Sequence, residues 1–155
     1  MKSVKFATAI CAVLLSFSAS VQARPVTQEE AAAFFKRMAE MNARFDSRYP
    51  ELYSPEATVI GHKDGEKTAV TGAQWQQLLV LGAEKAKKNN NKSTFSNMRY
   101  EQQGERMKIS ADRYAVRKCY TDSSYYMIVG RQSNGQLWIE EETFELSPPN
   151  QCKTR

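Results

Sequence analysis

The sequence has few of the residues that build metal centres or nucleophilic sites. It contains one histidine and three cysteines in 155 residues, and cysteines without a nearby histidine make a poor zinc set. No phosphate-binding loop, nucleophile elbow, zinc-protease helix or calcium-binding loop occurs. These absences argue against hydrolases and metalloenzymes, and we expect neither a metal nor a cofactor.

A strong charge of either sign is also lacking. The formal net charge is +5, and the basic residues are spread along the chain. Nucleic-acid binding needs a concentrated basic face with aromatic side chains beside it. The densest basic cluster, "EKAKKNNNK" at 84–92, is typical of a helix end followed by a solvated loop. We therefore expect no nucleic-acid partner.

Long apolar runs are missing except at the start of the chain. Two lysines precede an apolar stretch at 6–15 that is too short to span a bilayer. Val21 and Ala23 then occupy the two small-residue positions that a signal peptidase reads. This pattern predicts a signal peptide at 1–23 and a mature domain at 24–155. We expect a periplasmic or secreted protein with no membrane partner after cleavage.

Signal cleavage leaves an even number of cysteines. Cys11 lies inside the apolar stretch rather than at its end, which argues against a lipoprotein anchor, and it leaves with the signal. Cys119 and Cys152 remain in an oxidising compartment, where a pair is typical of a disulfide. The alternatives are metal binding and a reactive thiol. A bridge between them would close a loop of 33 residues, worth about 3–4 kcal/mol in the loop-entropy model.

Two stretches have helical periodicity. In the first, Thr27 is a plausible N-cap and Glu30 completes a capping box. Its apolar stripe consists of Ala31, Phe34, Phe35, Met38, Met41 and Phe45. About one helical turn fits near Tyr53 between two prolines. The second helix starts after Thr71, and its expected core positions are Trp75, Leu78, Leu79, Gly82 and Ala86.

The remaining segments read as strands. A tight hairpin at an Asp-Gly turn joins 57–61 to 67–70, and an Asn-Gly turn marks another hairpin near the end of the chain. Helices first and a long antiparallel meander last predict an α+β single domain. Long strands twist and curl, so we expect a curved, mostly antiparallel sheet wrapped around the N-terminal helices. The later strands are expected at 95–102, 107–120, 125–131 and 137–146.

Two segments carry a family resemblance. They are "YSPEATVIGHKDGEKTAVTGAQW" at 53–75 and "GQLWIEEETF" at 135–144. With the order of elements, they make the chain resemble the nuclear transport factor 2-like superfamily, which includes ketosteroid isomerases, polyketide cyclases and scytalone dehydratase. In that family the first segment is a hairpin followed by a glycine and a helix. The resemblance implies a cone-like domain with a pocket between sheet and helices, often paired into dimers through the sheet.

The catalytic groups of that superfamily do not carry over onto this chain. Its isomerases use a tyrosine, an aspartate base and a protonated aspartic acid, the last being a known case of a carboxyl kept neutral by apolar surroundings. Here Tyr49 and Tyr53 lie beyond the first helix, and no aspartate sits in a matching motif. The histidine–aspartate pair of the dehydratases has no clear counterpart either, because His62 stands beside a turn.

The expected strand at 107–120 has apolar residues in both phases of its alternation. Because side chains alternate strictly along a strand, one phase must change or both faces must be covered. We predict a β-bulge near Asp112 and Arg113 that turns one of them toward the cavity. The alternative is that helices cover one face and a partner subunit the other. The stretch "SYYMIVG" at 124–130 is apolar in both phases as well, which favours a homodimer through the outer face of the sheet.

Two polar features invite a catalytic interpretation. Glu140 and Glu142 should share the face of Trp138 and Phe144, where paired carboxylates could serve acid–base work. We expect a solvated or ion-paired role instead. His62 is interpreted as a polar strand end, with the mouth of a pocket as the alternative.

The function expected from these observations is that of an exported domain binding a small apolar ligand or another protein, since no catalytic set is recognisable. One alternative is a small isomerase, dehydratase or cyclase, with Asp112 as base and His62, Tyr49 or Tyr53 polarising the substrate. Another is an antagonist of a secreted protein. The candidate ligand-binding residues are Tyr49, Tyr53, His62, Trp75, Asp112, Arg113 and Tyr114.

Overall fold

The computed structural model describes residues 24–146 and 148–152, and the expected signal peptide at 1–23 lies outside this range. Among the described residues, no helix is long and apolar enough to cross a membrane. The helices are α1 (Gln28–Arg44), η1 (Tyr49–Leu52), α2 (Gly72–Lys88) and η2 (Val116–Lys118). The strands are β1 (Tyr53–Lys63), β2 (Glu66–Thr71), β3 (Ser93–Gln103), β4 (Arg106–Ala115), β5 (Tyr120–Asp122), β6 (Tyr126–Arg131) and β7 (Leu137–Glu145).

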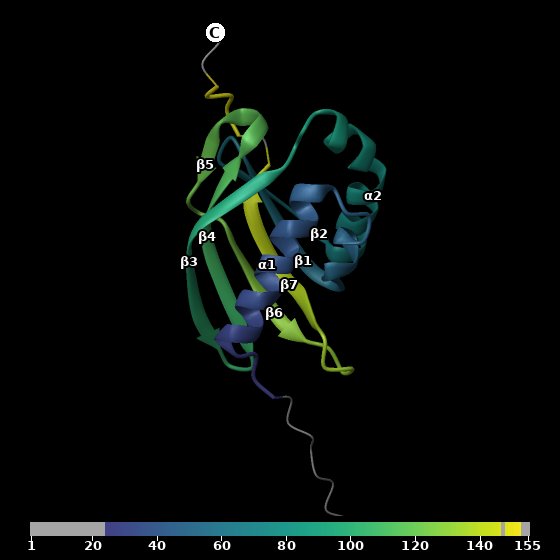
Figure 1. The fold of residues 1–155 in the computed structure, drawn as a ribbon, viewed down its shortest axis with the longest axis vertical. Helices are drawn as coiled ribbons and strands as arrows, with labels where there is room; N and C mark the ends of the chain where they lie inside the picture. The colour runs from purple at the N-terminus through teal and green to yellow at the C-terminus, as the bar shows by residue number, and fades with distance from the viewer. Residues whose placement is uncertain (1–23, 147, 153–155) are drawn as a thin grey trace, which may run out of the picture.

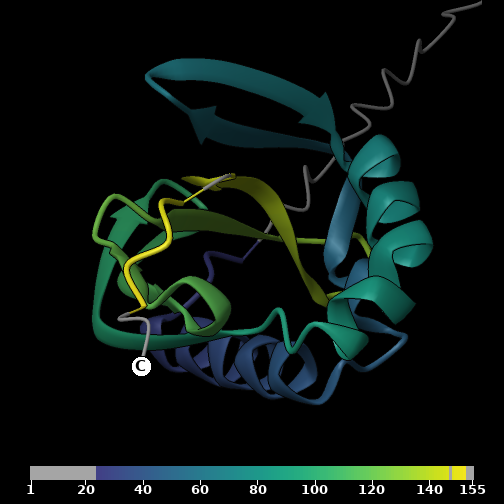
Figure 2. The ribbon, with the colours of Figure 1, turned by 90° about the horizontal axis from the view of Figure 1, so that it is seen from above.

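The strands form one curved sheet in the order β2-β1-β7-β6-β4-β3, with β5 paired to β4. Every pairing is antiparallel except that of β1 with β7, which is parallel. Helix α1 lies across one face of the sheet, and α2 stands at the side of the molecule (Figure 1). Seen from above, the sheet curls over α1 and α2 borders the open side (Figure 2). The predicted α+β architecture is confirmed.

Helix α1 begins where its capping box is placed. The Thr27 hydroxyl accepts from the Glu30 N–H at 3.2 Å, and the Glu30 carboxylate accepts from the Thr27 N–H at 3.0 Å. The Thr27 N–H and the nearby Arg131 guanidinium lower the pKa of Glu30 to about 2. Its apolar stripe is buried against the sheet, so α1 supplies much of the core; the buried members are Ala31, Phe34, Phe35, Met38 and Met41.

Helix α2 begins at a glycine because β1 passes directly beneath it. A Cβ at Gly72 would lie 1.8 Å from the Ser54 carbonyl oxygen and 2.9 Å from the Ala57 Cβ. We expect Gly72→Ala to lower the free energy of unfolding by about 1–3 kcal/mol or more, because backbone must move to make room. Urea denaturation measures the change.

Gly82 provides the matched control for this prediction. It lies inside α2, and a Cβ there meets nothing within 4 Å. Gly82→Ala should therefore raise the free energy of unfolding by roughly 0.5–1 kcal/mol, the ordinary helix-interior preference for alanine. Equal effects at the two positions would show that the close approach at Gly72 is unimportant.

The predicted strand at 107–120 is too long. Strand β4 ends at Ala115, and the residues after it form η2 and β5. Along β4 the odd-numbered positions face the core throughout, so its phase never changes. The irregularity lies in the partner strand, where Asn97 and Met98 of β3 together oppose Ala111. The bulge predicted in β4 near Asp112 is therefore wrong in its location.

Two expected core positions of α2 are also wrong. Leu78 is 51% exposed rather than buried, and a Cβ at Gly82 would meet nothing within 4 Å. The helix packs through Trp75 and Leu79 instead, which are partly buried against the core.

Candidate functional site

A β-bulge in β7 decides which of its carboxylates faces inward. Ile139 pairs with Val129 and Glu141 pairs with Ile128, so Glu140 is one residue extra. The Glu140 carboxylate lies over Gly130, where the absence of a side chain leaves room for it. An extra residue exchanges the two faces beyond it. The sequence-based placement of Glu142 on the face of Trp138 is therefore wrong.

Glu142 instead projects into the interior beyond Ile139, where it is 4% exposed and bound by two tyrosines. The Tyr53 hydroxyl donates to Glu142 Oε2 at 2.5 Å, and the Tyr125 hydroxyl donates to Oε1 at 2.8 Å. Tyr49 extends the cluster, because its hydroxyl lies 3.2 Å from that of Tyr53. Since the Tyr53 proton points to the carboxylate, Tyr49 donates to Tyr53 and keeps a lone pair free while Glu142 is ionised.

Burial shifts the titration of this cluster. It raises the pKa of Glu142, although the two tyrosine hydrogen bonds and the nearby Arg113 charge act in the opposite direction. Burial and the Glu142 charge also raise the pKa of Tyr53 and of Tyr125 well above its usual range. The cluster therefore presents a carboxyl that is easier to protonate than an exposed glutamate, held by hydroxyls that stay protonated.

Tyr49, Tyr53 and Glu142 of this cluster line a pocket of about 610 Å³, which we name the α2 pocket, and we call the side that they form its floor. The pocket lies between the C-terminal end of α1, η1, α2 and the strands β3, β4 and β7. Its apolar lining includes Met41, Phe45, Trp75, Leu79, Phe95 and Phe144. A volume of roughly 300–1,000 Å³ with aromatic walls and a few polar groups is typical of a small-ligand site.

Arg113 brings a positive charge to the same pocket. Its Nε donates to the Ser93 hydroxyl at 3.1 Å, and its guanidinium lies over the Phe144 ring, 5.0 Å from the centroid. Nη1 makes a longer bond of 3.4 Å to the Glu145 carbonyl oxygen. Within 24–146 and 148–152, Arg113 forms no salt bridge. Its charge is thus available to an acceptor in the pocket.

Trp75 adds an unused donor. Its ring packs beside Phe144 with centroids 5.4 Å apart. The indole Nε1 is buried and has no hydrogen-bond partner in the described part of the chain. A buried N–H without a partner is costly, and an acceptor atom on a bound molecule would satisfy it.

The structure brings together four of the residues suggested by sequence and separates three. Tyr49, Tyr53, Trp75 and Arg113 line the α2 pocket, and that pocket does not include His62, Asp112 or Tyr114. The sequence predicted that either Asp112 or Arg113 faces the cavity, and the one that lines the α2 pocket is Arg113.

His62 lies on the outer face of the sheet. Its Nε2 is 2.9 Å from the Thr143 hydroxyl of the neighbouring strand β7. Val59 of β1 and Glu142 of β7 face the interior of the protein. Because side chains alternate along a strand, His62 and Thr143 project to the other face of the sheet. The interpretation as a polar strand residue therefore matches its contact.

Asp112 is tied to its surroundings outside the pocket. The Asn97 amide donates to its Oδ2 at 2.6 Å, and this bond together with one from Ser123 lowers the pKa of Asp112. A lowered pKa makes a carboxylate a weaker proton acceptor. Glu142 differs from Asp112 in both respects, since it lines the pocket and its pKa is raised.

The signal that could have identified Glu142 was present in its own strand. Leu137 and Ile139 are odd-numbered apolar positions, whereas Phe144 is even-numbered. A change of phase within one strand indicates a bulge, and a bulge between them turns Glu142 inward.

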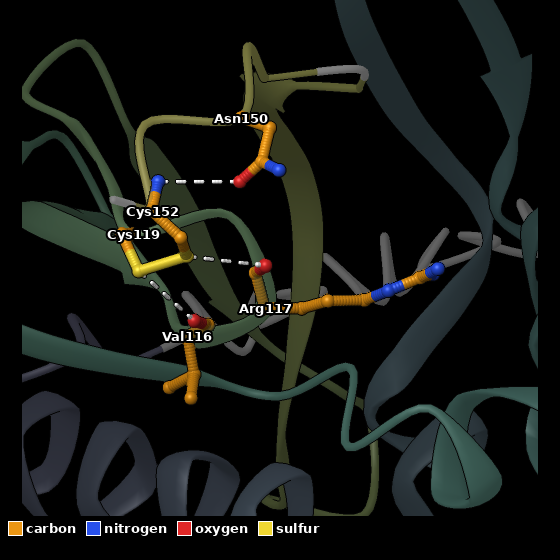
Figure 3. Close-up of a disulfide and its surroundings, with 5 residues drawn as sticks. All are labelled: Val116, Arg117, Cys119, Asn150 and Cys152. Atoms are coloured by element: carbon orange, nitrogen blue, oxygen red, sulfur yellow. Dashed lines mark hydrogen bonds between the residues drawn. A yellow bond between two sulfur atoms is a disulfide. The ribbon is translucent and has the colours of Figure 1, made fainter. Parts of the chain in front are cut away.

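The predicted disulfide is confirmed. Cys119 and Cys152 are bonded, and the bridge holds the C-terminal segment against η2 (Figure 3). The Cys152 N–H donates to the Asn150 side chain, and the Gln151 N–H donates to the Lys118 carbonyl at 2.8 Å. Pro148 from this segment reaches the rim of the α2 pocket. Among the described residues there is no cluster of three metal-ligating side chains.

No protein-family model matches this chain, and no curated protein sequence does either. Solved structures do match it. A nuclear transport factor 2-like protein of unknown function from Pseudomonas putida is 10% identical, with a TM-score of 0.57 over 81% of this chain and 95% of that one. The yeast UBP3-associated protein BRE5 is 17% identical, with a TM-score of 0.55 over 76% and 95%.

ActVI-ORFA from Streptomyces coelicolor is 10% identical, with a TM-score of 0.50 over 74% of this chain and 92% of that one. At such identities the similarity concerns the fold alone. The two helices, the curved sheet and these matches agree with the resemblance seen in the sequence. The protein therefore has the nuclear transport factor 2-like fold.

Proposed function

We propose that this protein is an exported binding domain that holds a small, mainly apolar ligand in the α2 pocket. The observation that supports it best is the buried Glu142 carboxyl on the floor of that pocket, bound by Tyr53 and Tyr125. Polar groups are costly to bury and fix the orientation of whatever meets them. Apolar walls around them favour a ligand that is largely hydrocarbon.

The polar groups at the pocket specify what the ligand carries. The free Trp75 N–H and the Arg113 guanidinium are donors, so each suits an acceptor oxygen such as a carbonyl or carboxylate. Tyr49 offers a lone pair and suits a hydroxyl on the ligand. A ligand with a ring or chain body and oxygens at one end satisfies all three.

Native mass spectrometry of the protein purified from its own host tests the proposal. We expect an added small-molecule mass on the wild type, and Arg113→Met should reduce its occupancy about tenfold through loss of a charged hydrogen bond. Lys108→Met is the matched control, since Lys108 is on the same strand but lies over the Tyr126 ring, outside the pocket. It should retain the ligand.

Other masses would decide against this function. A bare protein in every preparation contradicts ligand binding. A stoichiometric protein partner supports the antagonist of a secreted protein instead. The same spectra give the oligomeric state, so they also test the homodimer expected through the outer face of the sheet.

A small isomerase, dehydratase or cyclase is the second candidate. It would use the same pocket as the binding domain, but it would convert the bound molecule rather than only hold it. A general base works best when its pKa is close to the operating pH, and burial raises the pKa of Glu142 in that direction. In this candidate Glu142 replaces Asp112 as the base, and Arg113 or Trp75 stabilises the oxygen on which charge develops. Once a ligand is identified, its conversion by the wild type but not by Glu142→Gln separates an enzyme from a carrier.

A further inference from the structure

Helix α2 exposes apolar side chains that the fold does not use. Leu81 is 83% exposed and Leu78 is 51% exposed. Because positions three, seven and ten residues apart recur on one side of a helix, Leu78 and Leu81 share their side with Lys85 and Lys88. We name these four residues the outer face of α2. Helix α2 stands at the side of the molecule (Figure 2), and all four residues of this face are exposed.

The outer face of α2 combines leucines with unpaired positive charge. Lys85 and Lys88 are exposed, and Lys92, four residues after the end of the helix, is a third lysine that is half-exposed. In the described part of the chain, none of these three lysines forms a salt bridge. Glu84 is the one carboxylate of α2, so positive charge predominates at this end of the helix.

This combination matches an anionic lipid surface. Leucine side chains enter the boundary between headgroups and acyl chains, and lysines reach the negatively charged headgroups beside them. The helix has 17 residues and three lysines in its last turn, so it lies on a bilayer rather than spanning one. The expectation of no membrane partner came from the lack of a spanning segment, which surface binding does not require.

A second copy of the chain fits the same face less well. A stable protein interface buries roughly 800 Å² on each partner, and two leucines of one helix provide only a small part of that area. Membrane binding needs no such area, because each inserted side chain and each lysine contributes separately.

We propose that the protein docks on anionic phospholipid membranes through the outer face of α2. Leu81 and Leu78 insert into the bilayer, and Lys85, Lys88 and Lys92 bind its headgroups. This inference does not depend on what the α2 pocket holds, since none of these five residues lines that pocket.

Vesicle flotation with the mature chain tests the proposal. We expect binding to vesicles of phosphatidylcholine mixed with phosphatidylglycerol, weaker binding at high salt, and none to phosphatidylcholine alone. Leu81→Ser should weaken binding about tenfold. Lys85→Gln with Lys88→Gln should weaken it by about 25-fold, since each lysine contributes about fivefold.

Matched variants elsewhere on the surface serve as controls. Met98→Ser removes a 45% exposed side chain from β3, and Lys36→Gln with Lys67→Gln removes the same charge from other elements. Both should bind vesicles as the wild type does. The proposal is overturned if the wild type binds neither vesicle, if it binds both equally, or if the controls lose as much binding as the α2 variants. Sedimentation showing a dimer that Leu81→Ser dissociates would also overturn it, by assigning the face to a second copy.

Discussion

Replacing Glu142 with leucine should lower the free energy of unfolding by about 1–3 kcal/mol, because the buried Tyr125 hydroxyl loses its acceptor and Tyr53 keeps only Tyr49, 3.2 Å away, as a partner among the described residues. Tyr53 and Tyr125 both donate to this carboxylate and are 2% and 1% exposed, so their hydroxyls have little access to water. If the hydroxyls cause the loss, removing them should restore stability. The triple variant Glu142→Leu, Tyr53→Phe, Tyr125→Phe should therefore recover most of it.

The neighbouring glutamate supplies the control. Glu141 accepts from the Tyr126 hydroxyl at 2.6 Å, but on the half-exposed outer face of the same strand. There water can replace the lost acceptor, so Glu141→Leu should cost less than about 1 kcal/mol. Chemical denaturation of all four proteins gives the comparison. Equal losses at Glu141 and Glu142, or no recovery in the triple variant, would show that the buried cluster is not what stabilises this region.

The pH dependence of stability gives the same cluster a second readout. The folded state raises the pKa of Glu142, so between the unfolded and folded values it binds more protons than the unfolded chain. The free energy of unfolding should then fall as pH rises through that window and level off above it. Glu142→Gln removes the titrating group, and its curve should lack this fall. Glu30 has the opposite effect on the pH dependence, because its pKa is lowered to about 2. Its contribution to the free energy of unfolding is lost as pH falls toward that value.

Local signals in the sequence were sufficient for the parts of the fold that local interactions decide. The start of α1 follows from the Thr27–Glu30 capping box, and the β1–β2 turn follows from Asp64 and Gly65, both of which adopt positive φ. The burial of Phe34 and Phe35 follows from spacing alone. Each of these features depends on residues a few positions apart, so a single sequence contains the information.

The faces of the later strands were harder to predict, because they depend on contacts between distant segments. Glu140 bulges out where Gly130 of the next strand leaves space for it, and that space cannot be seen from β7 alone. One inserted residue reverses the facing of everything after it, which moves Glu142 from the outer surface to the pocket floor. Four candidate pocket residues were still found, since Tyr49, Tyr53 and Trp75 lie outside the bulged strand and β4, which carries Arg113, keeps its phase.

Removing the disulfide should lower the free energy of unfolding by about 3–4 kcal/mol, since it releases a loop of 33 residues in the unfolded chain. For a domain of this size, that corresponds to a melting temperature lower by about 10–15 °C. Differential scanning calorimetry of the oxidised protein and of Cys119→Ser with Cys152→Ser measures it. A reducing agent should lower the wild type to the level of the double variant and leave the double variant unchanged.

The bridge should also have a local effect that hydrogen exchange can separate from the global one. The Gln151 N–H donates to the Lys118 carbonyl oxygen next to the bridge. Without the covalent link, holding the tail in place costs its full conformational entropy. In the double variant the Gln151 amide should therefore exchange at the rate of a free chain end, whereas Met127 in the buried strand β6 stays protected. A Gln151 amide that remained protected would show that packing alone holds the tail, and the rim of the α2 pocket at Pro148 would then be independent of the disulfide.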